Sequence, residues 1–218
     1  MATRARGTPR EREEAGDGAP EQDKRRLILH AAVRVFAEKG YHGCRIADVA
    51  RAAGVAYGLV YHYFQNKDEL LESVFDEQWT IFIGALERID AGPGTAAEKI
   101  SDMFGFVFDV YKTAPAAVRV LMLEVTHTPQ GLRAGSTRET FETAVRLLAE
   151  VVRQGQERGE LRREASPVVA ATALLGAMEL TLSGMVMGLV PAGDEQEIDR
   201  ARAELVATAV DGLRVGAR

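Results

Sequence analysis

The stretch that decides the fold runs from Ile46 to Gln65 and reads IADVARAAGVAYGLVYHYFQ. Gly54 divides it into two short helical segments, since a glycine permits the tight turn between them. Ala50 and Ala53 supply the small side chains that two closely crossing helices need. The apolar anchors of the two segments are Ile46, Val49, Val55 and Val60. This pattern predicts a helix-turn-helix whose second helix lies in the major groove of DNA.

Six residues around the second helix are predicted to contact DNA. Gly58 has no side chain, so the backbone can approach DNA closely there, while Tyr61 and His62 can donate hydrogen bonds to phosphates. Tyr57 could offer its ring to a thymine methyl group or its hydroxyl to a base or phosphate. Lys67 opposes the dipole of the next helix, which a bound phosphate would explain. The predicted set is Arg45, Tyr57, Gly58, Tyr61, His62 and Lys67.

The same cluster of aromatic residues could instead be ordinary core, and this is the role we expect for Tyr63 and Phe64. Tyr61 follows the inward-pointing Val60 by one position, which turns it partly away from the core. We therefore assign Tyr61 to the DNA face.

Charge is distributed unevenly along the 218 residues. The net charge is −5, but residues 24–67 carry eight Lys or Arg and only two Asp or Glu, a net +6. Residues 1–23 carry −2 and residues 68–218 carry −9. A basic segment attached to an acidic body is typical of a small DNA-reading domain on a larger domain with another task, although a solvated surface would look similar.

Apolar periodicity predicts an all-α fold with three parts. Residues 1–21 lack periodic apolar positions and are expected to be a disordered tail. Residues 22–67 form the three-helix DNA-binding domain, whose first helix stops at Gly40 and is followed by a loop over 41–45. A long helix to about Asp90 leads into a second helical domain, residues 68–218. Its later helices are predicted at 95–113, with Thr95 as N-cap, 115–127, 134–159, 166–189 and 194–215.

Several functional classes are disfavoured by the sequence. Cys44 is the single cysteine, so an internal disulfide is excluded. The four histidines lack metal-ligand spacing, and neither a phosphate loop nor a nucleophile elbow is present, so we expect no metal, no cofactor and no enzyme activity. No signal peptide is found, and the apolar stretch 168–190 is interrupted and read as a buried helix. We therefore expect a cytoplasmic protein without a membrane partner.

The helix-turn-helix resembles that of the TetR family of bacterial transcriptional regulators, over about residues 24–82. The matching positions are Ile46, Ala47, Val49, Ala50, Ala53, Gly54, Val55, Val60, Tyr61, Tyr63, Phe64, Lys67 and Leu70. The resemblance implies a homodimeric regulator, most often a repressor, that a hydrophobic small molecule releases from a palindromic operator. It also implies that residues 68–218 are the ligand-binding and dimerisation domain. The chain departs from the family at Cys44-Arg45 and at 56–59, where hydroxyl residues are usual, and Arg45 could compensate by its longer reach.

The second half is rich in Met and Phe, which fit either a plain core or an apolar effector pocket. Short stretches at 120–125 and 175–181 are similar to acyl-CoA-responsive regulators of fatty-acid degradation, which implies a fatty acyl-CoA; a planar aromatic drug is the alternative. Arg119, Arg133 and Arg138 could meet CoA phosphates. The predicted ligand-binding residues are Met103, Phe104, Phe108, Tyr111, Met122, Glu124, Met178, Leu182 and Met185.

Small residues on the last two helices predict a four-helix dimer interface, with internal packing as the alternative. The residues are Ala170, Ala173, Leu174, Ala177, Gly184 and Gly188 on one helix, and Ala203, Val206, Ala207, Val210 and Leu213 on the other. A two-fold dimer places two recognition helices about 34 Å apart along DNA. The rival functions are an all-helical protein-binding adaptor and a regulator of drug efflux that responds to aromatic compounds. Specific retention of DNA in a gel shift would exclude the adaptor.

Overall fold

The computed structural model describes residues 21–120 and 135–214, and within these ranges the regular elements are helices, with one isolated antiparallel bridge between Leu161 and Arg214. The helices are α1 (Glu21–Gly43), α2 (Ile46–Ala53), α3 (Tyr57–Tyr63), α4 (Lys67–Ala91), α5 (Ala96–Thr113), α6 (Pro115–Val120), α7 (Gly135–Glu157), α8 (Pro167–Val186) and α9 (Glu195–Asp211). The all-α prediction is therefore confirmed.

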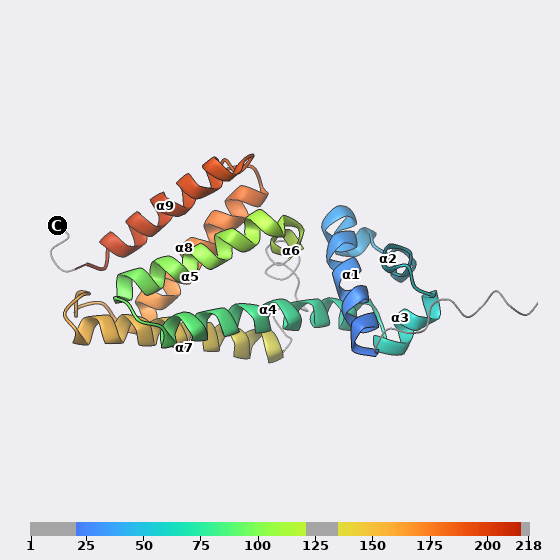
Figure 1. The fold of residues 1–218 in the computed structure, drawn as a ribbon, viewed down its shortest axis with the longest axis horizontal. Helices are drawn as coiled ribbons and strands as arrows, with labels where there is room; N and C mark the ends of the chain where they lie inside the picture. The colour runs from blue at the N-terminus through green and yellow to red at the C-terminus, as the bar shows by residue number, and fades with distance from the viewer. Residues whose placement is uncertain (1–20, 121–134, 215–218) are drawn as a thin grey trace, which may run out of the picture.

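Two hydrophobic cores organise the chain, and α4 runs from one into the other (Figure 1). The first core joins α1, α2 and α3 to the start of α4, around Phe36, Val60 and Phe64. The second core lies among the later part of α4 and helices α5, α7, α8 and α9, around Phe104 and Phe108. The arrangement places a small three-helix head at one end of a larger helical body.

Most predicted helix boundaries agree with the structure to within a few residues, and two in the N-terminal part differ. Gly40 has a left-handed φ of 69° and interrupts α1 as predicted, but residues 41–43 form a further turn instead of a loop. Ordered helix begins at Glu21, so only residues 1–20 of the expected tail lie outside the described residues. Of the helix predicted at 115–127, the structure describes α6 to Val120, and the remainder falls outside the described residues.

Side-chain caps fix the starts of two long helices. The Asn66 side chain accepts a 2.8 Å hydrogen bond from the Glu69 amide at the start of α4. At α5, Thr95 and Glu98 cap each other, with the Glu98 amide donating to the Thr95 hydroxyl at 3.2 Å and the Thr95 amide donating to Glu98 Oε2 at 2.8 Å. This capping box confirms Thr95 as the N-cap.

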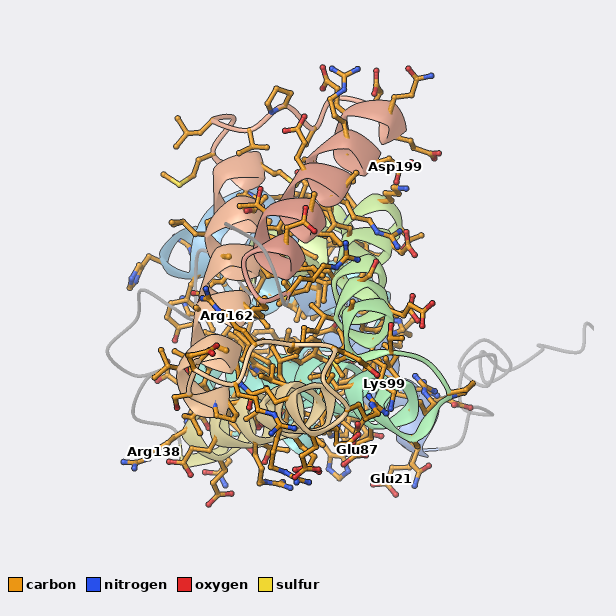
Figure 2. All side chains as sticks on the ribbon, turned by 90° about the vertical axis from the view of Figure 1, so that its left-hand side faces the viewer. Glu21, Glu87, Lys99, Arg138, Arg162 and Asp199 are labelled. Carbon is orange, nitrogen blue, oxygen red and sulfur yellow. The ribbon has the colours of Figure 1, made fainter. Side chains whose placement is uncertain are left out.

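A buried lysine ties the turn between α4 and α5 together. The ammonium group of Lys99 donates to the backbone carbonyl of Asp90 and lies 3.7 Å from the carboxylate of the same residue. The Ala96 amide donates to Glu160 Oε2 at 2.6 Å, which joins the start of α5 to the turn after α7. Only 5% of Lys99 is exposed. Other charged residues of the same body, such as Glu87, Arg138 and Asp199, lie on its outside (Figure 2).

The short helix α6 belongs to both cores. Its Val118 packs in the second core, whereas Ala117 and Val120 pack in the first, against α1. Six residues of helix thus touch both domains. Together with α4, α6 gives the larger body a direct mechanical connection to the three-helix head.

Within the described ranges, α8 has the length and apolar composition of a membrane-spanning helix. Core helices of soluble proteins share these properties, and Leu174, Met178 and Leu182 of α8 are buried in the second core. The apolar character of α8 is thus weak evidence for a membrane, and its buried side chains serve packing inside the protein.

Candidate DNA interface and ligand-binding core

The start of α2 is held by Asp48. Its carboxylate accepts a 3.1 Å hydrogen bond from the Arg45 amide and lies 2.8 Å from the ammonium group of Lys39. The hydrogen bond with Lys39 and, to a smaller extent, that with the Arg45 amide lower the pKa of Asp48 below the usual aspartate value. The Arg45 backbone is therefore fixed in the extended N-cap position, and its side chain is exposed to solvent.

The turn between α2 and α3 depends on Gly54, which has a left-handed φ of 67°. The Gly54 conformation lets the Val55 amide return to the carbonyl of Ala50 at 3.0 Å, closing α2. The next helix begins after Ala56, which provides no side-chain cap. This confirms the predicted loss of a capping hydroxyl, and α3 is held instead by Val60 and Phe64 in the core.

Two tyrosines form a contact on the outer face of α3. The Tyr57 and Tyr61 hydroxyls share a 3.1 Å hydrogen bond, and the ring centroids are 5.1 Å apart. This hydrogen bond, followed by desolvation, raises the pKa of Tyr61 above its ordinary value. Both side chains are exposed, by 54% and 44% respectively.

The remaining predicted residues of α3 also face solvent. Gly58 is exposed, and a Cβ built on it would meet no atom within 4 Å. His62 is exposed, with Nε2 3.6 Å from a carboxylate oxygen of Glu21. Tyr63 is half-buried and donates to the Glu21 carbonyl at 3.1 Å, while Phe64 is fully buried, as expected for core residues.

Lys67 has an internal role that the sequence did not indicate. Its ammonium group donates to the carbonyls of Tyr41 and Cys44, at 2.7 and 3.1 Å, and lies 4.2 Å from the centroid of the Tyr41 ring. It therefore ties the segment before α2 to the start of α4. Two of its three donor positions are occupied, so at most one is available for the predicted phosphate contact.

Other cations of the basic segment are also engaged within the domain. Arg34 donates to the Ala52 carbonyl at 3.2 Å, and the guanidinium carbon of Arg25 lies 5.2 Å from the centre of the Phe64 ring. Lys39 pairs with Asp48. The net charge of +6 thus overstates the number of side chains that are free to meet phosphates. Arg45 is exposed, and its side chain forms no ion pair within the described residues.

The predicted ligand-binding residues gather in the second core. Met103, Phe104 and Phe108 of α5 are buried there, and Tyr111 packs against them at its edge. From α8, the buried residues are Met178, Leu182 and Met185. Met122 and Glu124 lie outside the described residues. The structure brings seven of the predicted residues into one apolar cluster, in which they pack against neighbouring side chains.

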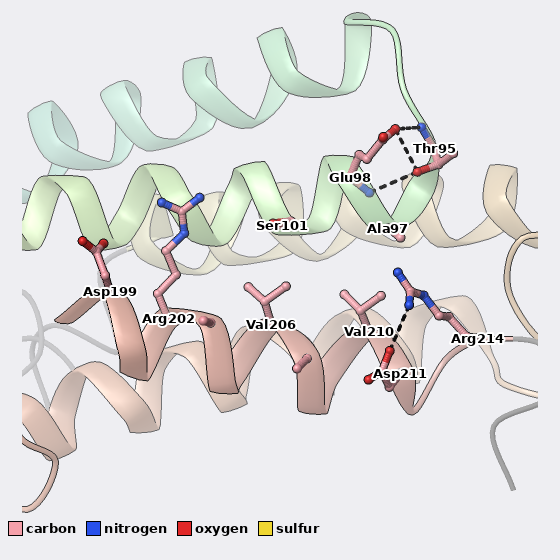
Figure 3. Close-up of a pocket in the computed structure, with 12 residues that line it drawn as sticks. Thr95, Ala97, Glu98, Ser101, Asp199, Arg202, Val206, Val210, Asp211 and Arg214 are labelled. Atoms are coloured by element: carbon pink, nitrogen blue, oxygen red, sulfur yellow. Dashed lines mark hydrogen bonds and ion pairs between the residues drawn. The ribbon is translucent and has the colours of Figure 1, made fainter. Parts of the chain in front are cut away.

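A surface groove lies elsewhere, between α5 and α9 (Figure 3). It has a volume of about 740 Å³ and combines apolar residues such as Val206 and Val210 with charged residues such as Glu98 and Arg214. The Arg202 side chain reaches from α9 toward α5, where its guanidinium lies against Gly105. None of the seven predicted ligand-binding residues that the structure describes lines this groove.

The predicted dimer face of α8 needs correction. Ala170, Leu174 and Gly184 are buried inside the protomer, so internal packing holds for them. The exposed face is rotated by one residue and carries an apolar stripe at helical spacing. This α8 stripe consists of Val169, Ala173, Gly176, Leu180 and Met187.

The predicted dimer face of α9 is also divided. Ala203 and Ala207 are exposed, whereas Val210 and Leu213 are buried and Val206 is half-buried. Val210 and Leu213 therefore belong to the protomer core. The side chains of the exposed alanines are small, so another helix can approach the backbone of α9 closely there.

Two family models match the chain. The model of bacterial regulatory proteins of the tetR family matches residues 28–74, which include α2 and α3. A model of the tetracyclin repressor-like C-terminal domain matches residues 97–207. The first match covers the three-helix head, and the second covers most of the helical body.

Individual proteins agree with the family models. The chain is 30% identical over 160 residues to the fatty acid metabolism regulator protein of Bacillus subtilis, covering 73% of this chain and 82% of that protein. It is 30% identical over 138 residues to the HTH-type transcriptional repressor NicS of Pseudomonas putida, covering 62% and 64% of the two chains. The structure of the regulator FadR from Bacillus subtilis in complex with stearoyl-CoA matches with a TM-score of 0.76 and 26% identity, over 87% of this chain and 99% of that chain.

Proposed function

The chain belongs to the TetR family of bacterial regulatory proteins, and from that premise we propose a repressor that a long-chain acyl-CoA releases from its operator. The chain is a ligand-responsive, DNA-binding transcriptional regulator. The observation that carries the finer proposal is the pairing of an exposed recognition helix with a Met- and Phe-rich core, in a chain similar to a fatty acid metabolism regulator. The proposed place of action is the bacterial cytoplasm, where the DNA lies.

Among the proposed phosphate contacts, Arg45 is the residue whose side chain can be replaced with the least effect on folding. Its backbone is fixed by Asp48, while its side chain is exposed at the edge of the helix-turn-helix. Lys67 is a weaker test of DNA binding, since its ammonium group also holds the segment before α2. A change at Lys67 would combine effects on folding with effects on binding.

Replacing Arg45 by Ala is expected to weaken DNA binding to about the same extent on every sequence. A lost phosphate contact also reduces the slope of log affinity against log salt concentration by about 0.9 for each protomer. The measurement is fluorescence anisotropy of labelled DNA at several salt concentrations. Arg138→Ala is the matched control, because Arg138 is exposed on α7 and pairs with Glu142. An unchanged slope for Arg45→Ala would show that Arg45 does not contact a phosphate.

The proposed effector site is the second core. The Met and Phe side chains there are soft and apolar, and such residues suit a hydrocarbon chain. The core is packed in the described structure, so an acyl chain has to displace side chains of α5 and α8. Arg119, exposed at the end of α6, is the described arginine we propose for the phosphates of CoA.

Movement in the core has two routes to the DNA-binding head. α4 contributes Leu86 to the second core and Leu70 to the first, and α6 contributes Val118 and Val120 in the same way. A ligand that spreads the second core therefore acts on the packing of α1 and on the direction of α4. DNA is released if the acyl-CoA binds better to the conformation whose recognition helices do not fit DNA.

Stearoyl-CoA is expected to lower operator affinity by about 5- to 150-fold, the usual range of coupling between two sites. The operator would first be obtained by selecting fragments from random DNA with the purified protein. Anisotropy titrations would then be repeated with stearoyl-CoA, with CoA alone and with stearate alone. If stearoyl-CoA binds and leaves operator affinity unchanged, the release mechanism is wrong. If planar aromatic compounds alone release the DNA, the effector is an aromatic compound and the repressor assignment stands.

The proposed assembly is a homodimer joined through the α8 stripe and the outer face of α9. Leu180 is 76% exposed and Val169 is 67% exposed. Large apolar side chains that are exposed along one face of a helix often mark an interaction surface. The small residues Ala173 and Ala207 allow the helices of two protomers to approach closely. A palindromic operator has the same two-fold symmetry.

A further inference from the structure

The two tyrosines of the recognition helix form one hydrogen-bonded unit. They lie one helical turn apart on α3, with an angle of 68° between their ring planes. The hydrogen bond between the two hydroxyls uses one of their two hydrogens. The pair therefore keeps one hydroxyl hydrogen for an outside acceptor.

Beside this hydrogen bond, the ring of Tyr57 is exposed. Within the described structure, its ring contact is with Tyr61, and more than half of its surface is open to solvent. An exposed aromatic ring on the face that meets the major groove is suited to an apolar group there. The C5-methyl of thymine is the apolar group that base pairs present in the major groove.

Gly58 supports an approach from outside at this point. The space around it is open, and its φ is not in the left-handed region, so neither packing nor backbone conformation requires a glycine. Glycine within a helix costs roughly 0.5–1 kcal/mol relative to alanine. A close approach of DNA to the backbone beside Tyr57 accounts for a residue that the fold does not need.

We infer that Tyr57 reads a thymine methyl group in each half-site, held in place by its hydrogen bond to Tyr61, whose own hydroxyl binds a phosphate. The inference rests on the proposed DNA binding and adds the base that is read. Because the reading uses a methyl group, it discriminates thymine from uracil, which has the same hydrogen-bonding edge.

The test uses a duplex selected from random DNA by the full-length protein. Each thymine of one half-site is replaced in turn by deoxyuridine, which removes only the methyl group. We expect one position at which affinity falls about fourfold, the value for losing one buried methyl group. Tyr57→Ala is expected to bind more weakly and to show no difference between thymine and uracil at that position.

A second variant separates the ring from the hydrogen bond. Tyr57→Phe keeps the ring but loses the hydrogen bond to Tyr61, so it should bind more weakly than the wild type and still prefer thymine over uracil. Circular dichroism melting would check that both variants fold, which the exposure of Tyr57 favours.

The outcomes are distinct for the two proposals. If the wild-type protein selects no DNA, the proposed function fails. If it selects DNA but no thymine methyl affects affinity, or if the effect persists in Tyr57→Ala, DNA binding stands and the inference is overturned.

Discussion

Replacing Leu180 by Glu is expected to convert the proposed dimer into a monomer and to remove most of its operator affinity. Burying a leucine side chain contributes about 1.5–3 kcal/mol. A two-fold dimer buries two copies of Leu180, one from each protomer. The dimer therefore loses about 3–6 kcal/mol, which raises its dissociation constant by at least about a hundredfold. Sedimentation velocity over a range of protein concentrations measures the change.

Ile81→Glu is the matched control for this experiment. Ile81 is also an exposed aliphatic residue, 51% exposed, but it lies on α4. The Ile81 variant should remain dimeric. A Leu180→Glu protein that sediments as the wild type does would place the dimer interface away from the α8 stripe.

Replacing Phe104 by Ala is expected to lower the free energy of unfolding by about 3–5 kcal/mol. Phe104 is 1% exposed and lies at the centre of the second core, among the residues of the proposed effector site. Its truncation leaves a cavity that the surrounding helices fill only in part. Urea denaturation followed by circular dichroism, at one fixed protein concentration, measures the loss.

Phe106→Ala is the comparison for this variant, because Phe106 lies on the same helix and is only half-buried. We expect its loss to be smaller than that of Phe104→Ala, because less apolar area of Phe106 is removed from water. Equal losses for the two variants would contradict the central position of Phe104 in the packing.

The sequence predicted the helix-turn-helix well because its signals are local. Gly54 alone marks the turn, and Val60 and Phe64 have the spacing of a buried helical face. Thr95 and Glu98 form a capping box, which can be recognised in the sequence because its two residues lie three positions apart. In each case the residues that determine the structure are close together in the chain.

The remaining features depend on contacts between distant residues. The bonds of Lys67 to Tyr41 and Cys44 span more than twenty residues, so its charge alone suggested a phosphate contact. The orientation of α8 depends on which face α7 and α9 cover. Because α8 is apolar on nearly all sides, periodicity did not separate the buried Ala170 and Leu174 from the exposed Val169 and Ala173.

The placement of α6 constrains how such regulators can be recombined. Ala117 and Val120 lie in the C-terminal half of the chain, yet they fill part of the core of the DNA-binding head. A chimera that joined this head to a different sensor domain at the start of α4 would leave a gap beside α1. A working exchange has to carry these two side chains with the head, or redesign α1 to fit the new sensor. The boundary between the two modules therefore passes through α6 in space. A chimera with a single junction in the chain cannot reproduce this boundary.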